Sequence, residues 1–234
     1  MLTVLLVVAA YLIGAIPFGL LLGLARGVDV RQHGSGNIGA TNVGRVLGRG
    51  WGKLCLALDI LKGLLPTGAA GLLLREGEPD VGLLLRWLAV GLAAVLGHVF
   101  PIYLRFRGGK GVATTIGVAL GVYPYYTVAM AVALGAYAAA RLTSGVVSAG
   151  SLALAIVFPA SLYVYLWLAG CSLAQHWPLQ AVAVLLGAII IVRHIANVRR
   201  LLRGEEMRPT GTRPDRAAAA NKSSPPTPTE ASDR

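Results

Sequence analysis

Long apolar runs alternate with short polar segments over most of this chain. A helix needs about 20 predominantly apolar residues to cross a bilayer. The run at Tyr125–Ala140 is of borderline length, and Val112–Val122 is about half as long as a spanning helix. The runs that reach the full length are Leu2–Ala25, Trp51–Leu74, Leu83–Leu104, Val146–Ala169 and Leu179–Val198. The pattern predicts an all-α integral membrane protein with about seven transmembrane helices.

The composition agrees with a membrane protein. Only 13% of the residues are charged, whereas soluble domains carry about 25%. The formal net charge of +11 is concentrated in residues 26–53, 105–110 and 193–208, and each of these segments flanks an apolar run. Basic clusters of this kind mark cytoplasmic loops and require no nucleic acid partner. We therefore expect the N-terminus outside and the C-terminus in the cytoplasm.

The composition changes at about Met207. Residues 207–234 are rich in Pro, Ser, Thr and Ala and show no apolar periodicity, so they cannot bury enough surface to offset the chain entropy lost on folding. We expect two parts: a transmembrane bundle over residues 1–206, which holds the functional site, and a disordered cytoplasmic tail over residues 207–234.

A glycine-rich segment, HGSGNIGATN at residues 33–42, matches the pattern G-x-G-x-x-G at Gly34, Gly36 and Gly39. That pattern marks a dinucleotide site only between a strand and a helix, with an acidic residue about 20 positions further on. Here membrane helices are predicted on both sides, and Asp59 lies inside one of them. A nicotinamide cofactor is therefore not expected.

Two polar loops nevertheless have chemistry suited to phosphate. Glycines let backbone N–H groups converge on an anion, and helix N-termini favour negative charge. Neither loop contains a carboxylate, which is what an anion site requires. The alternative is that both are ordinary polar loops at the membrane interface. The donors that the loops supply are Ser35, Asn37, Thr41, Asn42 and Arg45 in the first, and Lys110 and Thr114 around Gly108, Gly109 and Gly111 in the second.

Two further pairs of polar residues have helical spacing. His194 and Asn197 share a helix face at the inner end of the last apolar run, although a lone histidine there is also typical of a snorkelling interfacial residue. Asp59 and Lys62 lie inside a membrane segment, where charges are costly, so we expect a structural ion pair rather than a proton relay. His98 stands without such company and is interpreted as structural.

Three motifs together resemble the bacterial acyl-phosphate:glycerol-3-phosphate acyltransferase family (PlsY), over most of residues 1–206. GSGNIGATNVGR is similar to the family's first motif, GGKGVAT to its second, and HIANVRRLLRGEE to its third. LDILKG around Asp59 and VVSAGS around Ser148 also resemble family segments. The resemblance implies a seven-helix bundle in the bacterial inner (plasma) membrane, with its active site near the cytoplasmic face.

The resemblance also implies an activity: transfer of a fatty acyl group from acyl phosphate, not acyl-CoA, to the 1-hydroxyl of glycerol 3-phosphate. The products would be lysophosphatidic acid and inorganic phosphate, in phospholipid biosynthesis. The expected partners are acyl phosphate, glycerol 3-phosphate and membrane lipid. No cofactor or metal is expected, because acyl phosphate already has a good leaving group and no His, Asp or Glu cluster has ligand spacing.

We hypothesise catalytic roles for His194, Asn197 and Ser148. His194 is a candidate general base, but the phosphate of the donor is an equally open candidate for the proton acceptor. Phosphate binding is assigned chiefly to Ser35, Arg45 and Lys110. The full set expected to bind substrate is Ser35, Asn37, Gly39, Thr41, Asn42, Arg45, Gly108, Gly109, Lys110, Gly111 and Thr114.

A transporter of a phosphorylated solute is the rival interpretation. Many apolar helices, basic loops and a buried ion pair would suit one. Against it, the polar motifs gather on one predicted face, and no inverted repeat is visible in the sequence.

Overall fold

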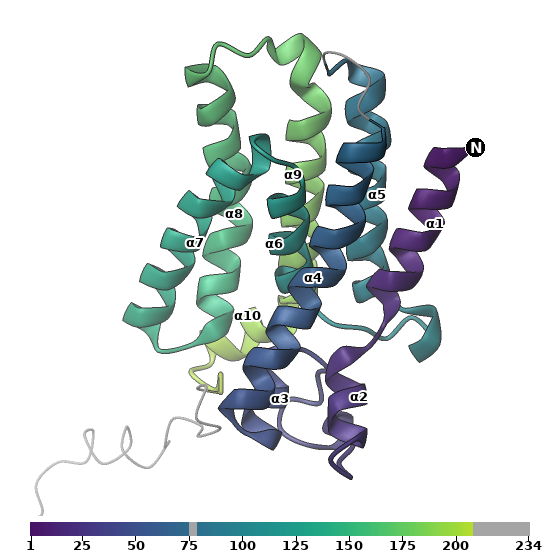
Figure 1. The fold of residues 1–234 in the computed structure, drawn as a ribbon. Coiled ribbons are helices and arrows are strands. Elements are labelled where there is room, and N and C mark those ends of the chain that lie inside the picture. The colour runs from purple at the N-terminus through teal and green to yellow at the C-terminus, as the bar shows by residue number, and fades with distance from the viewer. Residues whose placement is uncertain (75–78, 208–234) are drawn as a thin grey trace, which may run out of the picture.

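The structure is a computed structural model, and it describes residues 1–74 and 79–207 (Figure 1). Within these residues every regular element is helical. The elements, in chain order, are α1 (Leu2–Ala15), α2 (Phe18–Leu24), η1 (Val30–Gln32), α3 (Ala40–Leu47), α4 (Arg49–Leu73), α5 (Val81–Val99), η2 (Ile102–Leu104), α6 (Val112–Gly121), α7 (Tyr125–Ser144), α8 (Val147–Leu168), α9 (Leu173–Arg193) and α10 (Ile195–Leu202).

The prediction of an all-α membrane protein is confirmed. Among the described residues, six helical segments are long and apolar enough to cross a bilayer, counting α1 and α2 together as the segment Leu2–Leu24. The short run predicted near residues 112–122 forms α6, which has 10 residues and lies inside the bundle (Figure 1). The predicted total of about seven segments corresponds to these six and α6.

Two predicted continuous segments are broken in the structure, and both breaks correct the sequence prediction. In the first apolar run, α1 ends at Ala15 and α2 begins at Phe18. The break occurs because Pro17 has no N–H and its ring is incompatible with a continuing helix. The last run leaves helical geometry at His194, where ψ is 4°, and continues in α10.

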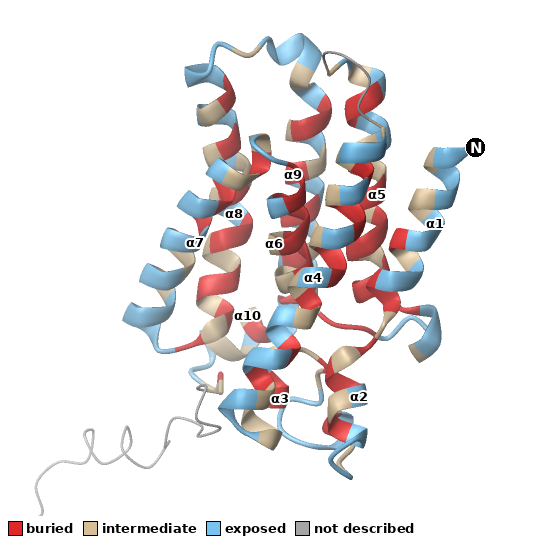
Figure 2. Ribbon diagram, viewed as in Figure 1, coloured by how far each residue is buried: buried red, intermediate tan, exposed pale blue. Residues whose placement is uncertain are grey.

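The core and the outer surface divide as expected for a bundle in lipid. The main core centres on large buried side chains such as Leu88, Tyr126 and Phe158. Figure 2 shows exposed residues along the outer sides of α1 and α7, and many of these are large and apolar. In water such a surface would be unfavourable, whereas hydrocarbon accepts it.

Close contact between α4 and α6 fixes the position of the second glycine loop. A Cβ at Gly63 would collide with the carbonyl of Thr114, and one at Gly117 would collide with the carbonyl of Ile60. Glycine at both positions lets the two backbones approach, as small residues do between membrane helices. The N-terminus of α6 is thereby held beside the middle of α4.

The polar elements gather at one end of the molecule. Figure 1 shows α2, α3 and α10 at this end, opposite to the N-terminus of α1. At the same end the Arg45 guanidinium donates a hydrogen bond of 3.0 Å to the carbonyl of Met207. The predicted disordered tail lies, apart from Met207, outside the described residues, as does the acidic part of the loop at residues 75–78.

Candidate active site

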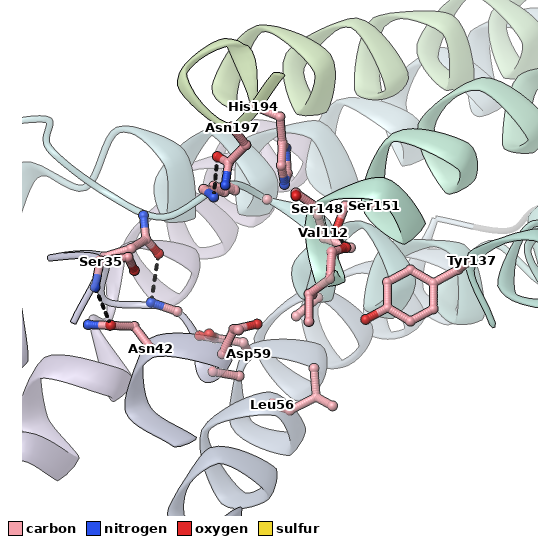
Figure 3. A pocket seen from close by; sticks show the side chains of 18 of the residues that line it. Ser35, Asn42, Leu56, Asp59, Val112, Tyr137, Ser148, Ser151, His194 and Asn197 are labelled. Atoms are coloured by element: carbon pink, nitrogen blue, oxygen red, sulfur yellow. Dashed lines mark hydrogen bonds between the residues drawn. The ribbon is translucent and has the colours of Figure 1, made fainter. Parts of the chain in front are cut away.

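One pocket of about 350 Å³ lies where the polar end of the bundle meets its apolar middle. Figure 3 shows His194, Asn197 and Ser148 on one side of it and Ser35 and Asn42 on another. The pocket collects most of the residues that the sequence singled out. Those lining it are Ser35, Asn37, Gly39, Thr41, Asn42, Arg45, Lys110, Gly111, Ser148, His194 and Asn197.

Asn42 holds the first glycine loop in shape. Its Oδ1 accepts a hydrogen bond of 2.8 Å from the backbone N–H of Ser35, and its Nδ2 donates to the carbonyls of Val30 and His33. Gly34 and Gly36 supply the positive φ angles, 61° and 70°, that the turn needs. Asn42 is 1% exposed and its amide already has partners at both ends, so it positions the loop.

The remaining polar side chains of this loop line the pocket and make fewer hydrogen bonds within the protein than Asn42 does. Asn37 Oδ1 accepts a 2.8 Å hydrogen bond from the N–H of Gly39, which stands just before α3. Ser35 and Thr41 are exposed and line the pocket, and neither hydroxyl is hydrogen-bonded within residues 1–74 and 79–207. These two hydroxyls and the N-terminus of α3 are therefore available to an anion.

The second glycine loop is built on His98. A Cβ at Gly109 would overlap the His98 imidazole, and the Gly109 N–H donates to the His98 carbonyl at 3.0 Å. The Arg193 guanidinium donates to the carbonyls of Gly108 and Gly109 at 3.0 and 3.2 Å. These contacts present Lys110 to the pocket. Gly108 and Gly109, by contrast, do not line it.

Thr114, also expected to bind substrate, lies behind the pocket rather than on its wall. It is fully buried in the first turn of α6, and its hydroxyl has no hydrogen-bond partner among the described residues. Its backbone carbonyl is the group that packs on Gly63 of α4. The structure therefore places Thr114 in the packing of two helices.

Glu206 connects the segment around Ser148 to the third motif and, through Asn197, to the second glycine loop. Its Oε1 accepts hydrogen bonds from Ser148 at 3.0 Å and from the Asn197 amide, and its Oε2 pairs with Arg200 at 2.7 Å. On its other side, Asn197 accepts a 2.6 Å hydrogen bond from Lys110. Asn197 is 5% exposed, so both ends of its amide are committed within the protein.

The presence of Glu206 corrects one expectation. The two glycine loops contain no carboxylate, and a phosphate site was expected to exclude negative charge. The fold brings a carboxylate into the site from another segment, where it is paired with Arg200. Its position in the segment RRLLRGEE, inside the third motif, was the signal that pointed to it.

Burial and neighbouring charges set the protonation states at this wall. Burial, helped by the charge of Lys110, lowers the pKa of His194 to about 4. Burial also lowers the pKa of Lys110 to about 8, although the charge of Glu206 opposes it. Burial alone would raise the pKa of Glu206, but hydrogen bonds from Asn197, Arg200 and Ser148 outweigh it and lower the pKa.

His194 is consequently neutral near pH 7. Its Nδ1 lies 2.8 Å from the carbonyl of Ile190, and because a carbonyl only accepts hydrogen bonds, this nitrogen carries the proton. Its Nε2 is then the unprotonated nitrogen and can accept a hydrogen bond from a hydroxyl group. The residue is 2% exposed, so the structure does not support the interpretation of a snorkelling side chain.

Asp59, which lines the pocket, forms the predicted buried ion pair with Lys62. Lys62 Nζ lies 2.8 Å from Asp59 Oδ1, and both side chains are buried, which confirms the expected ion pair. Lys62 also donates a 2.9 Å hydrogen bond to the carbonyl of Ile16, at the break between α1 and α2. A broken helix inside a membrane leaves carbonyls without partners, and Lys62 satisfies one of them.

His98 is the residue whose role sequence reasoning missed. It lines the pocket with Asp59, and its Nδ1 lies 3.7 Å from Asp59 Oδ1. It connects α4 to the second glycine loop, since Gly109 packs on the same imidazole. Nothing in the local sequence around His98 signals this, because its partners come from two other segments.

The other part of the pocket is apolar and comes from α4, α6 and α7. Figure 3 shows Leu56, Val112 and Tyr137 at this side. Leu56 and Leu134 line the pocket and are also about 40% exposed on the surface, at 42% and 37%. The pocket therefore runs from a polar wall to side chains that lie at the surface of the bundle.

The described residues contain no group of three or more His, Cys, Asp or Glu side chains placed to hold a metal ion. What the pocket does offer is cationic and hydroxyl donors, a neutral imidazole and an apolar extension. The fold and the site together define an integral membrane protein with a pocket that is polar and cationic on one side and apolar on the other.

Comparison with known proteins identifies the family. The profile described as glycerol-3-phosphate acyltransferase matches residues 4–204. The chain is 46% identical to the glycerol-3-phosphate acyltransferase of Desulfotalea psychrophila over 200 residues, covering 84% of this chain and 93% of that protein. It is 40% identical to that of Aquifex aeolicus, covering 87% and 97%. This chain belongs to the glycerol-3-phosphate acyltransferase family.

Two solved structures are similar in fold. Both are crystal structures of PlsY (YgiH), an integral membrane glycerol 3-phosphate acyltransferase. Its glycerol 3-phosphate form superposes with a TM-score of 0.73 at 37% identity, covering 89% of this chain and 96% of that chain. Its lysophosphatidic acid form gives 0.72 at 36% identity, covering 89% and 95%. The chain is therefore a multi-pass membrane acyltransferase of phospholipid biosynthesis.

Proposed function

We propose that this enzyme transfers a fatty acyl group from acyl phosphate to the 1-hydroxyl of glycerol 3-phosphate, releasing lysophosphatidic acid and inorganic phosphate. The observation that carries the proposal is that Arg45, Lys110 and His194 line the same pocket as an apolar wall. Both substrates carry a phosphate and one carries a fatty chain, so one pocket must serve both chemistries.

The phosphate groups are bound by the two glycine loops. Arg45 supplies a planar guanidinium that matches phosphate oxygens, and Ser35 and Thr41 supply hydroxyls beside the N-terminus of α3. Lys110 supplies a second positive charge, immediately before the N-terminus of α6. Two phosphates bound between these elements hold the acyl donor next to the acceptor hydroxyl. Holding the two reactants close together in this way raises the reaction rate.

The fatty chain lies along the apolar side of the pocket. Leu56 of α4 and Leu134 of α7 both line the pocket and reach the surface of the bundle, where lipid surrounds the protein. A chain placed there buries apolar area without leaving the membrane, at roughly 0.8 kcal/mol for each buried CH₂. The carbonyl carbon is then at the boundary with the polar wall.

His194 orients the acceptor hydroxyl, and the donor phosphate takes its proton. The Nε2 of the neutral imidazole accepts the hydroxyl hydrogen bond. A phosphate has a second pKa of about 6, so it holds a proton more firmly than His194 with its pKa of about 4. The new ester bond forms as the carbonyl carbon–phosphate oxygen bond breaks, and the proton leaves with phosphate. Ser148 and Asn197 act through Glu206 and Lys110 to hold this wall in place.

The enzyme works in the bacterial inner membrane with this pocket near the cytoplasmic face. The basic segments at α3, α10 and the loop before α6 support this orientation, because positively charged segments remain on the cytoplasmic side. Glycerol 3-phosphate is a soluble anion and would reach the pocket from that side. The N-terminus would then lie outside.

The test is an assay of purified protein in detergent with glycerol 3-phosphate and either acyl phosphate or acyl-CoA. We expect lysophosphatidate and phosphate in equal amounts from acyl phosphate and no product from acyl-CoA. Because detergent micelles hold no gradient, product formation also excludes a transporter as the explanation. Product from acyl-CoA alone would overturn the proposed donor.

A further inference from the structure

A second hollow, of about 720 Å³, lies next to the active-site pocket. Asn37 is the one described residue that lines both, so the first glycine loop forms part of the wall between them. Gly108, at the start of the second glycine loop, lines this hollow and not the active-site pocket. The proposed reaction makes no use of this space.

Positive charge dominates the lining. Arg31, Arg105, Arg107 and Arg193 all line the hollow, and no carboxylate does so among residues 1–74 and 79–207. Arg31 is paired with Asp29 at 2.7 Å, just outside the lining. Guanidinium groups placed together repel one another, so an unneutralised group of them is favourable only when an anion binds.

Three of the four charges have no carboxylate partner in the described chain. Arg193 donates to the carbonyls of Gly108 and Gly109 and stacks on Phe100, contacts that leave its positive charge in place. The guanidinium groups of Arg105 and Arg107 make no hydrogen bond or ion pair within the described residues. Guanidinium is the side-chain group that best matches two oxygens of a phosphate.

The backbone that carries these arginines is strained. Arg105 and Phe106 have φ angles of 50° and 63°, in the left-handed region that is unfavourable for a residue with a Cβ. Two consecutive residues of this kind fold the chain back so that Arg105 and Arg107 line one hollow. Strained backbone of this sort is typical of binding sites.

The surroundings place the hollow where lipid head groups lie. The loop follows the end of the membrane segment Val81–Leu104, and Tyr103 and Phe106 are 55% and 58% exposed at its rim. Exposed aromatic side chains next to arginines at the end of a membrane segment are typical of the membrane–water interface. Both a lipid head group and a soluble anion can reach such a position.

From this geometry we propose that the hollow lined by Arg31, Arg105, Arg107 and Arg193 is a second phosphate-binding site, separate from the active site. Its ligand is a phosphate group, carried by an anionic phospholipid or by a soluble phosphate compound. Through Arg193, which donates to the carbonyls of Gly108 and Gly109, the hollow is in contact with the second glycine loop. The inference does not depend on the proposed reaction, because its test measures binding.

The first arm of the test measures soluble phosphate. The full chain in neutral detergent is titrated with radiolabelled inorganic phosphate, and bound phosphate per chain is compared for wild type, Arg105→Gln/Arg107→Gln and Arg86→Gln. Arg86 is an exposed arginine in the N-terminal half of α5, whereas the hollow lies beyond the C-terminal end of this helix, so Arg86 serves as the matched control. If soluble phosphate is the ligand, the double variant binds one phosphate fewer than wild type, and Arg86→Gln binds as many.

The second arm measures lipid. The same three proteins are placed in nanodiscs of phosphatidylcholine with phosphatidylglycerol, and retained lipid is identified by native mass spectrometry after transfer to detergent. If a lipid head group is the ligand, wild type and Arg86→Gln retain phosphatidylglycerol and the double variant loses it. Equal phosphate stoichiometry and equal lipid retention in all three proteins would overturn the proposal.

A folding control accompanies both arms. Acyl transfer by the double variant in neutral detergent should stay within about twofold of wild type, since exposed substitutions usually change free energies by no more than about 0.5 kcal/mol. If the double variant does not fold, the single variant Arg107→Gln goes through the same two arms and decides the question by the same outcomes.

Discussion

Lys110 Nζ donates a 2.6 Å hydrogen bond to Asn197 Oδ1, across 87 positions of sequence. The bond ties the second glycine loop to α10 and sets Lys110 beside the other donors of the pocket. The Nδ2 of the same Asn197 side chain donates a hydrogen bond to Glu206 Oε1, so Lys110 is connected to Glu206 through Asn197. The position of the lysine charge thus depends on residues of the third motif, far from the second glycine loop in sequence.

Lys110→Met should therefore weaken phosphate binding and also remove the hydrogen bond that connects the second glycine loop to Asn197. A hydrogen bond to a charged group contributes about 1.5–3 kcal/mol, so we expect kcat/KM for glycerol 3-phosphate to fall roughly 10- to 100-fold. Steady-state kinetics with acyl phosphate in excess measure this. Lys53→Met, which removes an exposed lysine at the start of α4, is the control and should leave kcat/KM unchanged.

His194→Gln separates an orienting role from that of a general base. Glutamine can still accept the hydroxyl hydrogen bond, so we expect kcat to remain within about tenfold of wild type if the donor phosphate takes the proton. Loss of a general base typically costs about 10²- to 10⁴-fold. A loss in that range would identify His194 as the base. The control is His176→Gln, which should have no effect, because this half-buried histidine in the first turns of α9 does not line the pocket.

The pH dependence of kcat/KM should report Lys110. Burial lowers its pKa to about 8, so the free enzyme loses this positive charge as the pH rises through 8, and phosphate binding weakens above that value. His194, with a pKa of about 4, is neutral throughout and adds no ionisation near neutral pH. In Lys110→Arg the charge persists, so the fall above pH 8 should disappear. A fall that persists in Lys110→Arg would assign it to another group.

Glu206→Gln should lower both stability and activity. The change leaves Arg200 without its carboxylate and weakens the hydrogen bonds from Ser148 and Asn197, so we expect a lower unfolding temperature and a higher KM for glycerol 3-phosphate. Because the folded pKa of Glu206 is lowered, wild type should lose this stabilisation as the pH falls through that pKa, and the variant should lack the change. Thermal unfolding at several acidic pH values measures it.

The buried pair Asp59–Lys62 gives a prediction about stability. Lys62→Met leaves a buried carboxylate unpaired and the Ile16 carbonyl without its donor, which should destabilise the protein by about 3–5 kcal/mol. Asp59→Asn/Lys62→Met removes both charges and should recover part of this loss. Denaturant unfolding in micelles compares the two. A double variant less stable than Lys62→Met would contradict the interpretation of a structural pair.

The sequence by itself determined the membrane class, the approximate positions of the helices and most of the pocket. Apolar runs of spanning length identify membrane segments because the thickness of the hydrocarbon layer is fixed. The glycine loops were recognisable because only particular residue types tolerate such turns and bind anions. The lining residues Ser35, Arg45 and Lys110 follow from these local rules, whereas His194 was indicated by its helical spacing with Asn197 and by the family resemblance.

The tertiary structure alone decided which polar residues act together. Glu206 joins the site despite the absence of carboxylates from both glycine loops, and His98 supports Gly109, because side chains far apart in sequence meet where helices pack. Gly108, Gly109 and Thr114 are residue types suited to anion binding, yet they do not line the pocket. Packing between segments decides this, because Gly109 packs on His98 and the carbonyl of Thr114 packs on Gly63. Periodicity and motif spacing describe one segment at a time, whereas the contacts between segments depend on how close glycine lets their backbones approach.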